Sequence, residues 1–530
     1  MPNASHASNS CWTCRQKRAK CDRLLPTCLR CSSLKLRCQG YDRPKTLVWT
    51  NSVASRGKMM GKATFNADEN SLDNHASKGP GRTPLVGCSA QTTAEAHLSS
   101  LKVSWPLTDP VMQDFPRDCR DYIRYFNLEL SKECVVYQQD SVNPFLALMP
   151  LMPQSQALCH AIIAISAFHY THRLVISHMQ APTSYAGSFL ESATPWHTSQ
   201  DHEWQLSNPM FCAQLRTALL HKQKALQYLK CEVQDEVVRN HDAVIAAAIL
   251  FVCMDVVEFG SRGWNHHLRG SEEILRGRKA IMTAGNPEAS LWLTYFDTAC
   301  TTFGIMGATL APTSSALTEY IAFPDPSFLQ TLRQSEDQTW VGCPAELLYS
   351  LSAINSLRSA PLMAPERLKT VLELCNSLQN FSASTWAQDF PDPRHHESRS
   401  HLAQAYKTAV EVYASRIFGS LPGQDYLSGA YLLEATQSAI FHMLSIPAED
   451  FHVKSLVWPA FVLGAETQIP ELRVMIRIIF RNIWVSSCCY NARNAAEMLE
   501  KIWARDSPPQ STEKSWLDYI WEQEDSWLFL

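Results

Sequence analysis

Six cysteines near the start of the chain have the residue type and the spacing to hold metal ions. They lie within 28 residues and follow C-x2-C-x6-C-x6-C-x2-C-x6-C, so the second half of the pattern repeats the first. The six are Cys11, Cys14, Cys21, Cys28, Cys31 and Cys38. Two cysteines separated by two residues can bind one metal ion through both thiolates without strain. The segment therefore predicts a thiolate metal centre.

The number of ligands indicates which centre this is. One tetrahedral zinc takes four ligands and would leave two cysteines idle, and two separate zincs would need eight. Two zincs that share two thiolates need six, so the pattern predicts a cluster of two zinc ions. Iron–sulfur clusters also use thiolates, but this spacing does not match the ferredoxin patterns. Three disulfides are a further alternative, which is disfavoured because residues 1–10 contain no secretory signal.

Charge is distributed unevenly between the cysteine-rich head and the remainder of the chain. Residues 1–45 carry a formal charge of +8, whereas residues 46–530 carry −12. A basic head on an acidic body predicts a polyanion partner for the head alone. A solvated basic tail is the alternative, but the metal-binding pattern in the same segment favours nucleic acid.

Several basic residues lie between the cysteines. Residues 15–20 read Arg-Gln-Lys-Arg-Ala-Lys, and a helix across them, held by zinc at both ends, would present several cations on one side. Arginine and lysine in the major groove pair with guanine O6 and N7, and other cations contact phosphates. Each could instead be an exposed charge that touches nothing. The predicted contacts to double-stranded DNA are Arg15, Lys17, Arg18, Lys20, Lys35 and Arg37.

The segment CWTCRQKRAKCDRLLPTCLRCSSLKLRCQGY resembles the fungal Zn2Cys6 binuclear cluster of zinc-cluster transcription factors. The resemblance implies that Cys11 and Cys28 bridge the two zincs and that the other two cysteines of each half complete one zinc each. It places the position that reads CGG-type triplets at Arg18, with Lys17 beside it. The loop proline of the family matches Pro26.

This resemblance implies a function for the whole chain. We expect a sequence-specific, DNA-binding regulator of RNA polymerase II genes that acts in the nucleus and controls a metabolic gene set. Transcriptional co-regulators and a second copy of the chain are the further partners considered. The alternative is a helical interaction scaffold whose zinc cluster is only structural, and the cations between the cysteines argue against it.

Composition divides the chain into three parts. Residues 1–45 are expected to form the Zn2Cys6 DNA-binding domain, residues 46–110 a flexible linker rich in Ser, Asn, Gly, Lys and Thr, and residues 111–530 an all-helical domain, which family resemblance implies is regulatory. The linker lacks an apolar heptad repeat, so no coiled coil is expected there. A homodimer would have to form through the helical body.

The body is expected to be all-α, because its apolar residues recur at helical spacing and alternating β-branched runs are absent. It also resembles the fungal-specific transcription factor domain, through residues 122–126, residues 143–145 and Trp264 with residues 267–270. Two further helices are expected to start near Asn286 and at Pro365. The other expected helices are 117–138, 154–177, 213–233, 241–259, 264–282, 343–358, 398–419, 427–445, 470–484 and 486–505.

Nothing in the body indicates an enzyme. The chain lacks the dinucleotide, P-loop, nucleophile-elbow and zinc-protease patterns. His169 and His172, three residues apart, could share a metal, but satisfied core or surface histidines are the more common case. The acidic and aromatic segment 516–530 has the composition of an activation segment, and a terminal helix docked on the body is the favoured alternative.

Overall fold

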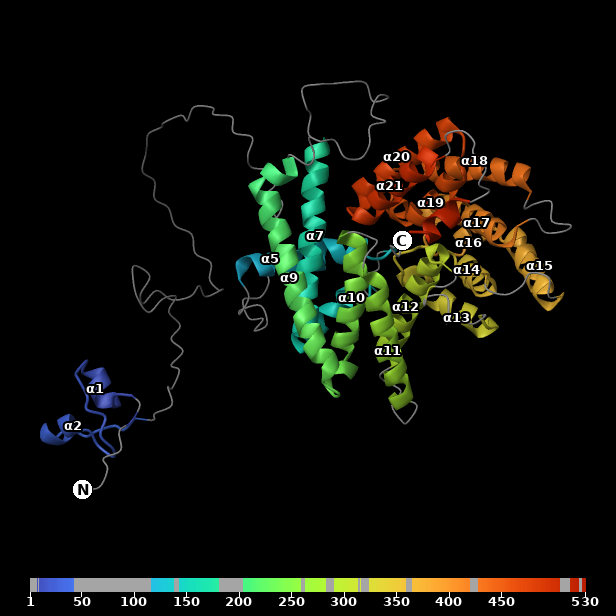
Figure 1. Cartoon of the computed structure of the whole chain (residues 1–530). Coiled ribbons are helices and arrows are strands. Elements are labelled where there is room, and N and C mark those ends of the chain that lie inside the picture. Colours follow the sequence, from blue (N-terminus) through green and yellow to red (C-terminus); the bar gives the residue numbers. More distant parts are fainter. Residues whose placement is uncertain are drawn as a thin grey trace, which may run out of the picture. The chain divides into compact units, whose positions relative to one another are not determined.

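The structure is a computed structural model of the chain (Figure 1). It describes residue 7 and residues 9–41, 116–137, 143–180, 204–258, 263–282, 290–312, 315, 324–358, 365–419, 428–505, 515–523 and 527–530. The chain forms two compact units, a head and a body, and each is described by itself. The predicted linker and the helix start at Asn286 lie outside the described residues.

The head contains two short helices, α1 (Trp12–Gln16) and α2 (Leu29–Ser33), each opening on a cysteine. Helices of five residues are not stable alone in water, because the free-energy cost of nucleating the helix exceeds the gain from the few hydrogen bonds of one turn. A segment of this size also buries too little apolar surface to fold unaided. The apolar interior of the head consists of its own cysteines, with Leu36 and Tyr41 packed against them. Its fold therefore depends on what the sulfur atoms bind.

The body is all-α, as expected, and no strand occurs among its described residues. Its first half contains α5 (Arg117–Tyr125), a π-helical turn (Phe126–Leu130), α6 (Ser131–Glu133), a 3-10 helix (Leu146–Gln154), α7 (Gln156–Gln180), α9 (Pro209–Gln234), α10 (Asp242–Glu258), α11 (Trp264–Met282) and α12 (Ser290–Leu310). Its second half contains α13 (Pro326–Ser335), α14 (Ala345–Leu357), α15 (Pro365–Asn380), α16 (Ala383–Gln388), α17 (His396–Phe418), α18 (Gly429–Ser445), α19 (Val457–Glu466), α20 (Pro470–Ser487), α21 (Tyr490–Arg505) and α22 (Trp516–Trp521).

Helix α10 lies at the centre of the first half. Every residue from Ala243 to Glu258 is buried, so no side of the helix faces solvent. A helix that is buried all round needs neighbours on all sides. α7, α9, α11, α12 and α21 surround it, and α7 and α9 lie side by side along one flank (Figure 1). No helix in the described part of the chain is long and apolar enough to cross a membrane.

A tryptophan joins α11 to α12. Trp264 is the residue that carries part of the resemblance of the body, and it is fully buried. Its ring lies directly against Gly307, where a Cβ added to the glycine would come within 2.1 Å of the ring. Only glycine at this position allows the two helices to approach so closely. The stretch containing Trp264 is therefore a packing element of the core.

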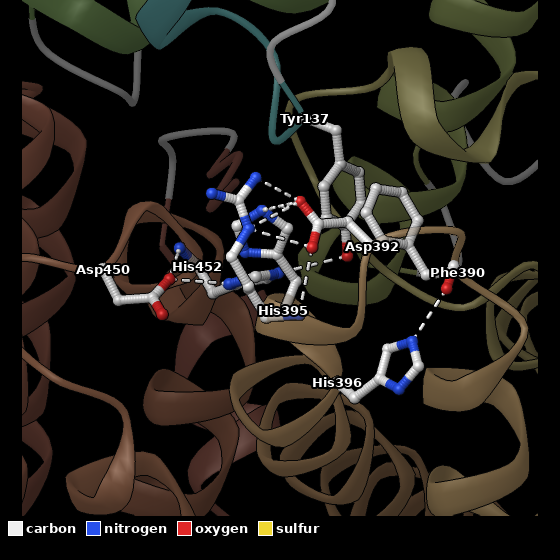
Figure 2. A network of polar contacts seen from close by, with 8 residues as sticks. Tyr137, Phe390, Asp392, His395, His396, Asp450 and His452 are labelled. Atoms are coloured by element: carbon white, nitrogen blue, oxygen red, sulfur yellow. Dashed lines mark hydrogen bonds and ion pairs between the residues drawn. The ribbon is translucent and has the colours of Figure 1, made fainter.

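A network of polar side chains connects the first half of the body to the second (Figure 2). The buried His452 places Nδ1 2.6 Å from Oδ1 of Asp450 and Nε2 3.1 Å from the hydroxyl of Tyr137. Ser398 donates a hydrogen bond to the other oxygen of Asp450. The three connected segments are thus residues 131–137, the start of α17 and the 3-10 helix Phe451–Leu456.

A second buried group of charges lies beside that network. The guanidinium of Arg399 is 3.6 Å from the centroid of the Trp386 ring and also faces Tyr137 and Phe390. It forms an ion pair with Glu336 at 3.5 Å. Burial is the main cause that raises the pKa of Glu336 to about 7, although the positive charge of Arg399 opposes the rise. Arg399 therefore neutralises a carboxylate that water cannot solvate.

Glu411 provides a pH-dependent test of the body. It is 1% exposed on α17, and burial raises its pKa to about 7 from an ordinary value of 4.5. The folded state thus favours the protonated acid, and stability is lost as the pH rises from 4.5 through 7. We expect Glu411→Gln to stabilise the body by roughly 2–3 kcal/mol near pH 8 and by almost nothing near pH 4.5.

The measurement for Glu411→Gln is urea unfolding of the full chain at both pH values. Glu397→Gln is the matched control, because Glu397 is exposed on the same helix. Its effect should be small at either pH. An equal effect of Glu411→Gln at both pH values would show that this carboxyl carries no buried charge.

The described segment after α21 is part of the core of the body. Segment 527–530 packs into the core after α22, and the side chain of Asn491 bonds the backbone of Leu528 and Leu530. Of the two alternatives for segment 516–530, the structure shows the terminal helix docked on the body.

Both ring nitrogens of His169 are engaged, because Nδ1 bonds the hydroxyl of Tyr125 and Nε2 bonds the carbonyl of Ser487. His169 therefore has no free nitrogen for a metal shared with His172.

Candidate zinc cluster and DNA interface

The two halves of the head repeat the same local structure. The sulfur of Cys11 accepts a hydrogen bond from the backbone N–H of Cys14, and the sulfur of Cys28 accepts one from Cys31. Each first cysteine is therefore the N-cap of its helix. A C-x2-C pair that starts a helix directs both sulfurs to the same side, and the sequence repeat becomes a structural one.

The six sulfurs gather into two overlapping groups of four. One contains Cys11, Cys14, Cys21 and Cys28, and the other contains Cys11, Cys28, Cys31 and Cys38. Within each group the sulfur atoms lie within 4.8 Å of one another. Cys11 and Cys28 belong to both groups. These two positions are the ones that the resemblance assigns to the bridging ligands.

The distances between sulfurs fit zinc. Four sulfurs around a zinc at about 2.3 Å lie roughly 3.8 Å apart in a regular tetrahedron. The sulfur of Cys11 lies 3.6 Å from that of Cys28 and 3.8 Å from that of Cys31. These distances exceed the ~2.05 Å of a disulfide, and all six cysteines are unpaired. The donor set and its spacing thus suit zinc rather than disulfides.

Thr13 connects the two halves of the head. Its hydroxyl donates to the carbonyl of Arg37 at 2.9 Å and accepts from the N–H of Gln39 at 3.0 Å. Asp22 makes a second connection by accepting the N–H of Leu29 at 3.0 Å, and this bond lowers the pKa of Asp22. Neither contact was predicted from the sequence. Only the repeat of the cysteines could have indicated that the segments meet.

The helix that carries the predicted DNA contacts is shorter than expected. The sequence predicts a helix across residues 15–20, but α1 ends at Gln16. Arg18 follows in the left-handed conformation with φ 48°, and the N–H of Ala19 bonds the carbonyl of Cys14. The expectation of one helix through all four cations is wrong. The reason is that the chain must turn back for Cys21 to reach the metal group.

The second half closes in the same way. Lys35 occupies the position equivalent to Arg18 and has φ 51°, and the N–H of Leu36 bonds the carbonyl of Cys31. Both cations therefore lie on tight turns that follow the two helices capped by cysteine sulfurs. A left-handed residue without glycine is uncommon. No glycine marks these turns in the sequence, so sequence reasoning missed them.

All six predicted DNA-contacting cations are exposed. Arg15 lies at the end of α1, with its guanidinium 5.6 Å from the ring centroid of Trp12. Lys17 caps α1, and Arg18 and Lys20 follow it. The structure thus presents these four in one short segment. Lys35 and Arg37 occupy the other half of the head.

Two family models match the chain. Residues 9–47 match the fungal Zn(2)-Cys(6) binuclear cluster domain, and residues 121–530 match the fungal specific transcription factor domain. The first match contains all six cysteines of the head and all six cations that are predicted to contact DNA. The second spans most of the helical body.

Named relatives are fungal proteins with regulatory descriptions. The chain is 22% identical to the acriflavine sensitivity control protein acr-2 of Neurospora crassa, over 99% of this chain and 97% of the relative. It is 22% identical to the phomenoic acid biosynthesis cluster-specific transcriptional regulator of Leptosphaeria maculans, over 87% and 79%. It is 44% identical to the pestheic acid cluster transcriptional regulator 3 of Pestalotiopsis fici, over only 11% and 10%. No solved structure matches the chain.

Proposed function

The chain belongs to the fungal transcription factors that carry a Zn(2)-Cys(6) cluster, which are transcription regulators and not enzymes, and we propose that its head binds two zinc ions and reads CGG-type triplets. The observation that carries the proposal is the pair of shared cysteines. Two groups of four that have Cys11 and Cys28 in common provide six ligands for two metals. Cys14 and Cys21 then complete one zinc, and Cys31 and Cys38 the other.

The zincs supply the fold of the head rather than chemistry. Six thiolates and two Zn2+ sum to −2, so the formally +8 head keeps a charge near +6. This charge attracts the phosphates, and its effect falls steeply as salt rises. The turn after α1 then presents Lys17 and Arg18 to base edges, while Arg15, Lys20, Lys35 and Arg37 contact phosphates.

Base reading and phosphate contact predict different losses on substitution. We expect Arg18→Ala to weaken binding to the preferred site by about 1–3 kcal/mol, with little change on unrelated DNA. Lys20→Ala should weaken binding to both sequences about equally and reduce the salt dependence. The measurement is a titration of the full chain with duplexes selected from a random pool and with shuffled duplexes, at two salt concentrations.

The control for this comparison is Lys369→Ala, an exposed cation of the body on α15. It should leave both affinities unchanged. Equal losses on selected and shuffled DNA for Arg18→Ala would remove it as the base-reading residue. A selection that enriches no CGG-type triplet would overturn the proposed specificity.

Further parts of the proposal concern place and targets. A DNA-binding regulator must act in the nucleus, and the basic head also has the composition of an import signal. One relative is described as the regulator of a phomenoic acid biosynthesis cluster and another as a regulator of a pestheic acid cluster, which supports a metabolic gene set as the target. Co-regulators and a second copy of the chain are the proposed partners of the body.

A further inference from the structure

An exposed stripe of apolar side chains runs along α20. Val474, Ile478 and Val485 are 43%, 47% and 38% exposed, while the opposite side of the helix is packed against the body. β-branched residues exposed in this number on one helix are uncommon on a surface that meets only water. α20 is one of the outer helices of the second half (Figure 1).

The spacing of the stripe is that of a coiled-coil seam. Its exposed members are Glu471, Val474, Ile478, Arg481 and Val485, which recur at alternating steps of three and four residues. This places Glu471, Ile478 and Val485 at a positions and the other two at d positions of a heptad. Such a seam matches another helix that runs alongside.

The charges in the seam select the partner and its direction. We propose that α20 pairs in antiparallel orientation with α20 of a second copy of this chain. In that pairing a positions face d positions, so Val474 meets Ile478 of the second copy, and Glu471 meets Arg481. Twofold symmetry produces each contact twice. A parallel pairing would instead place Glu471 against Glu471 and Arg481 against Arg481.

Neighbouring residues leave this seam free. Arg477, which directly precedes Ile478 on the same helix, is bound to Glu500 of α21 through two hydrogen bonds. Among the described residues, neither Glu471 nor Arg481 forms an ion pair within the chain. α18 packs beside α20 and exposes Leu433 and Phe441, which can extend the apolar surface.

The exposed stripe of α9 does not have this self-complementarity. It contains Leu219 and Leu226 between Arg216 and Lys230, all exposed. In the same antiparallel arrangement, with a positions facing d positions, Leu219 would meet Gln223 and Arg216 would meet Leu226 of the second copy, so no pair of opposite charges forms. α20 is therefore the better surface for a second copy. A single helix pair is small against the roughly 1,600 Å² of a standard interface, so the dimer is expected to be weak, on the order of micromolar.

The test exchanges the charges of the seam. Sedimentation velocity of the full chain over a range of concentrations should show a reversible dimer. Glu471→Arg and Arg481→Glu should each weaken it at least tenfold, because each places like charges together. The double variant Glu471→Arg, Arg481→Glu should restore it. Ile478→Asp should weaken it, and Arg216→Glu on α9 is the matched control that should not.

Each outcome decides the proposal. A chain that is monomeric at all concentrations overturns the proposal. So does a dimer whose affinity is unchanged by Glu471→Arg or Arg481→Glu. Single variants that weaken the dimer without rescue by the double variant also overturn the antiparallel pairing. The melting temperature of each variant shows whether its body is folded. Only the use of the dimer on paired DNA sites rests on the proposed function. Binding of every variant to a duplex with one triplet should equal that of the parent chain, so a failure of the dimer and a failure of DNA reading give different results.

Discussion

Replacing Cys28 by alanine is expected to remove both zincs from the head and to abolish specific DNA binding. Cys28 belongs to both groups of four sulfurs, so each metal loses a ligand. It also caps α2, so the helix loses its N-terminal acceptor. Zinc binding is the folding energy of such a small domain. The affinity should fall to that of non-specific binding, about 10³-fold or more below that of the selected site.

The measurement is metal content and DNA affinity on the same sample of full chain. Cys38→Ala is the informative comparison, because Cys38 belongs to one group only and the other zinc keeps four ligands. Cys212→Ala, which removes a half-buried cysteine of the body, is the control and should keep two zincs. Two zincs retained by Cys28→Ala would contradict the bridging assignment.

Replacing Arg399 by methionine is expected to destabilise the body more than any other change of a charged side chain considered above. The methionine keeps contact with Trp386 but leaves Glu336 without its neutralising charge. Removing one partner of a buried ion pair costs about 3–5 kcal/mol. The loss should be largest near pH 8, where Glu336 is ionised, and smaller near pH 6, because its pKa is about 7.

Urea unfolding at the two pH values measures this effect. Arg276→Met is the matched control, since Arg276 and its partner Glu273 are both exposed on α11. Exposed pairs contribute about 0–1 kcal/mol. Adding Glu336→Gln to Arg399→Met should recover part of the stability, because it removes the uncompensated charge. A loss that is the same at both pH values and unaffected by Glu336→Gln would assign the effect to packing alone.

Most of the body helices could be predicted from the sequence, including α10, which is buried on all sides and corresponds to the expected helix 241–259. The expected helix 264–282 has the bounds of α11, and the expected start at Pro365 is that of α15. α12 and α19 were not predicted with bounds. Their residues are apolar on nearly every side, so their sequences show no helical period. Their packing, against Trp264 for example, is decided by distant residues.

The metal site could be predicted more fully than the DNA-binding surface. Ligand number and spacing are properties of the sequence, and they predicted six ligands for two metal ions, while the resemblance to the zinc-cluster family indicated which cysteines belong to both groups of sulfurs. The end of α1 at Gln16 depends instead on the turn that brings the sulfur of Cys21 next to those of Cys11 and Cys14. No residue type marks the turn at Arg18. The network around Asp450 and His452 was missed for a similar reason, because its members come from segments far apart in the chain.

The sulfur atoms that cap α1 and α2 are also the ones shared by both metal groups, and this has a consequence for the cell. In the proposed cluster of two zincs, neither short helix is expected to be stable without metal, and losing one ion disturbs two ligands of the other. Release of one zinc should therefore weaken the binding of the second. Under zinc starvation we expect the regulator to leave its genes while its abundance and the fold of its body stay unchanged. Its occupancy on chromatin would then report zinc supply as well as any inducing signal.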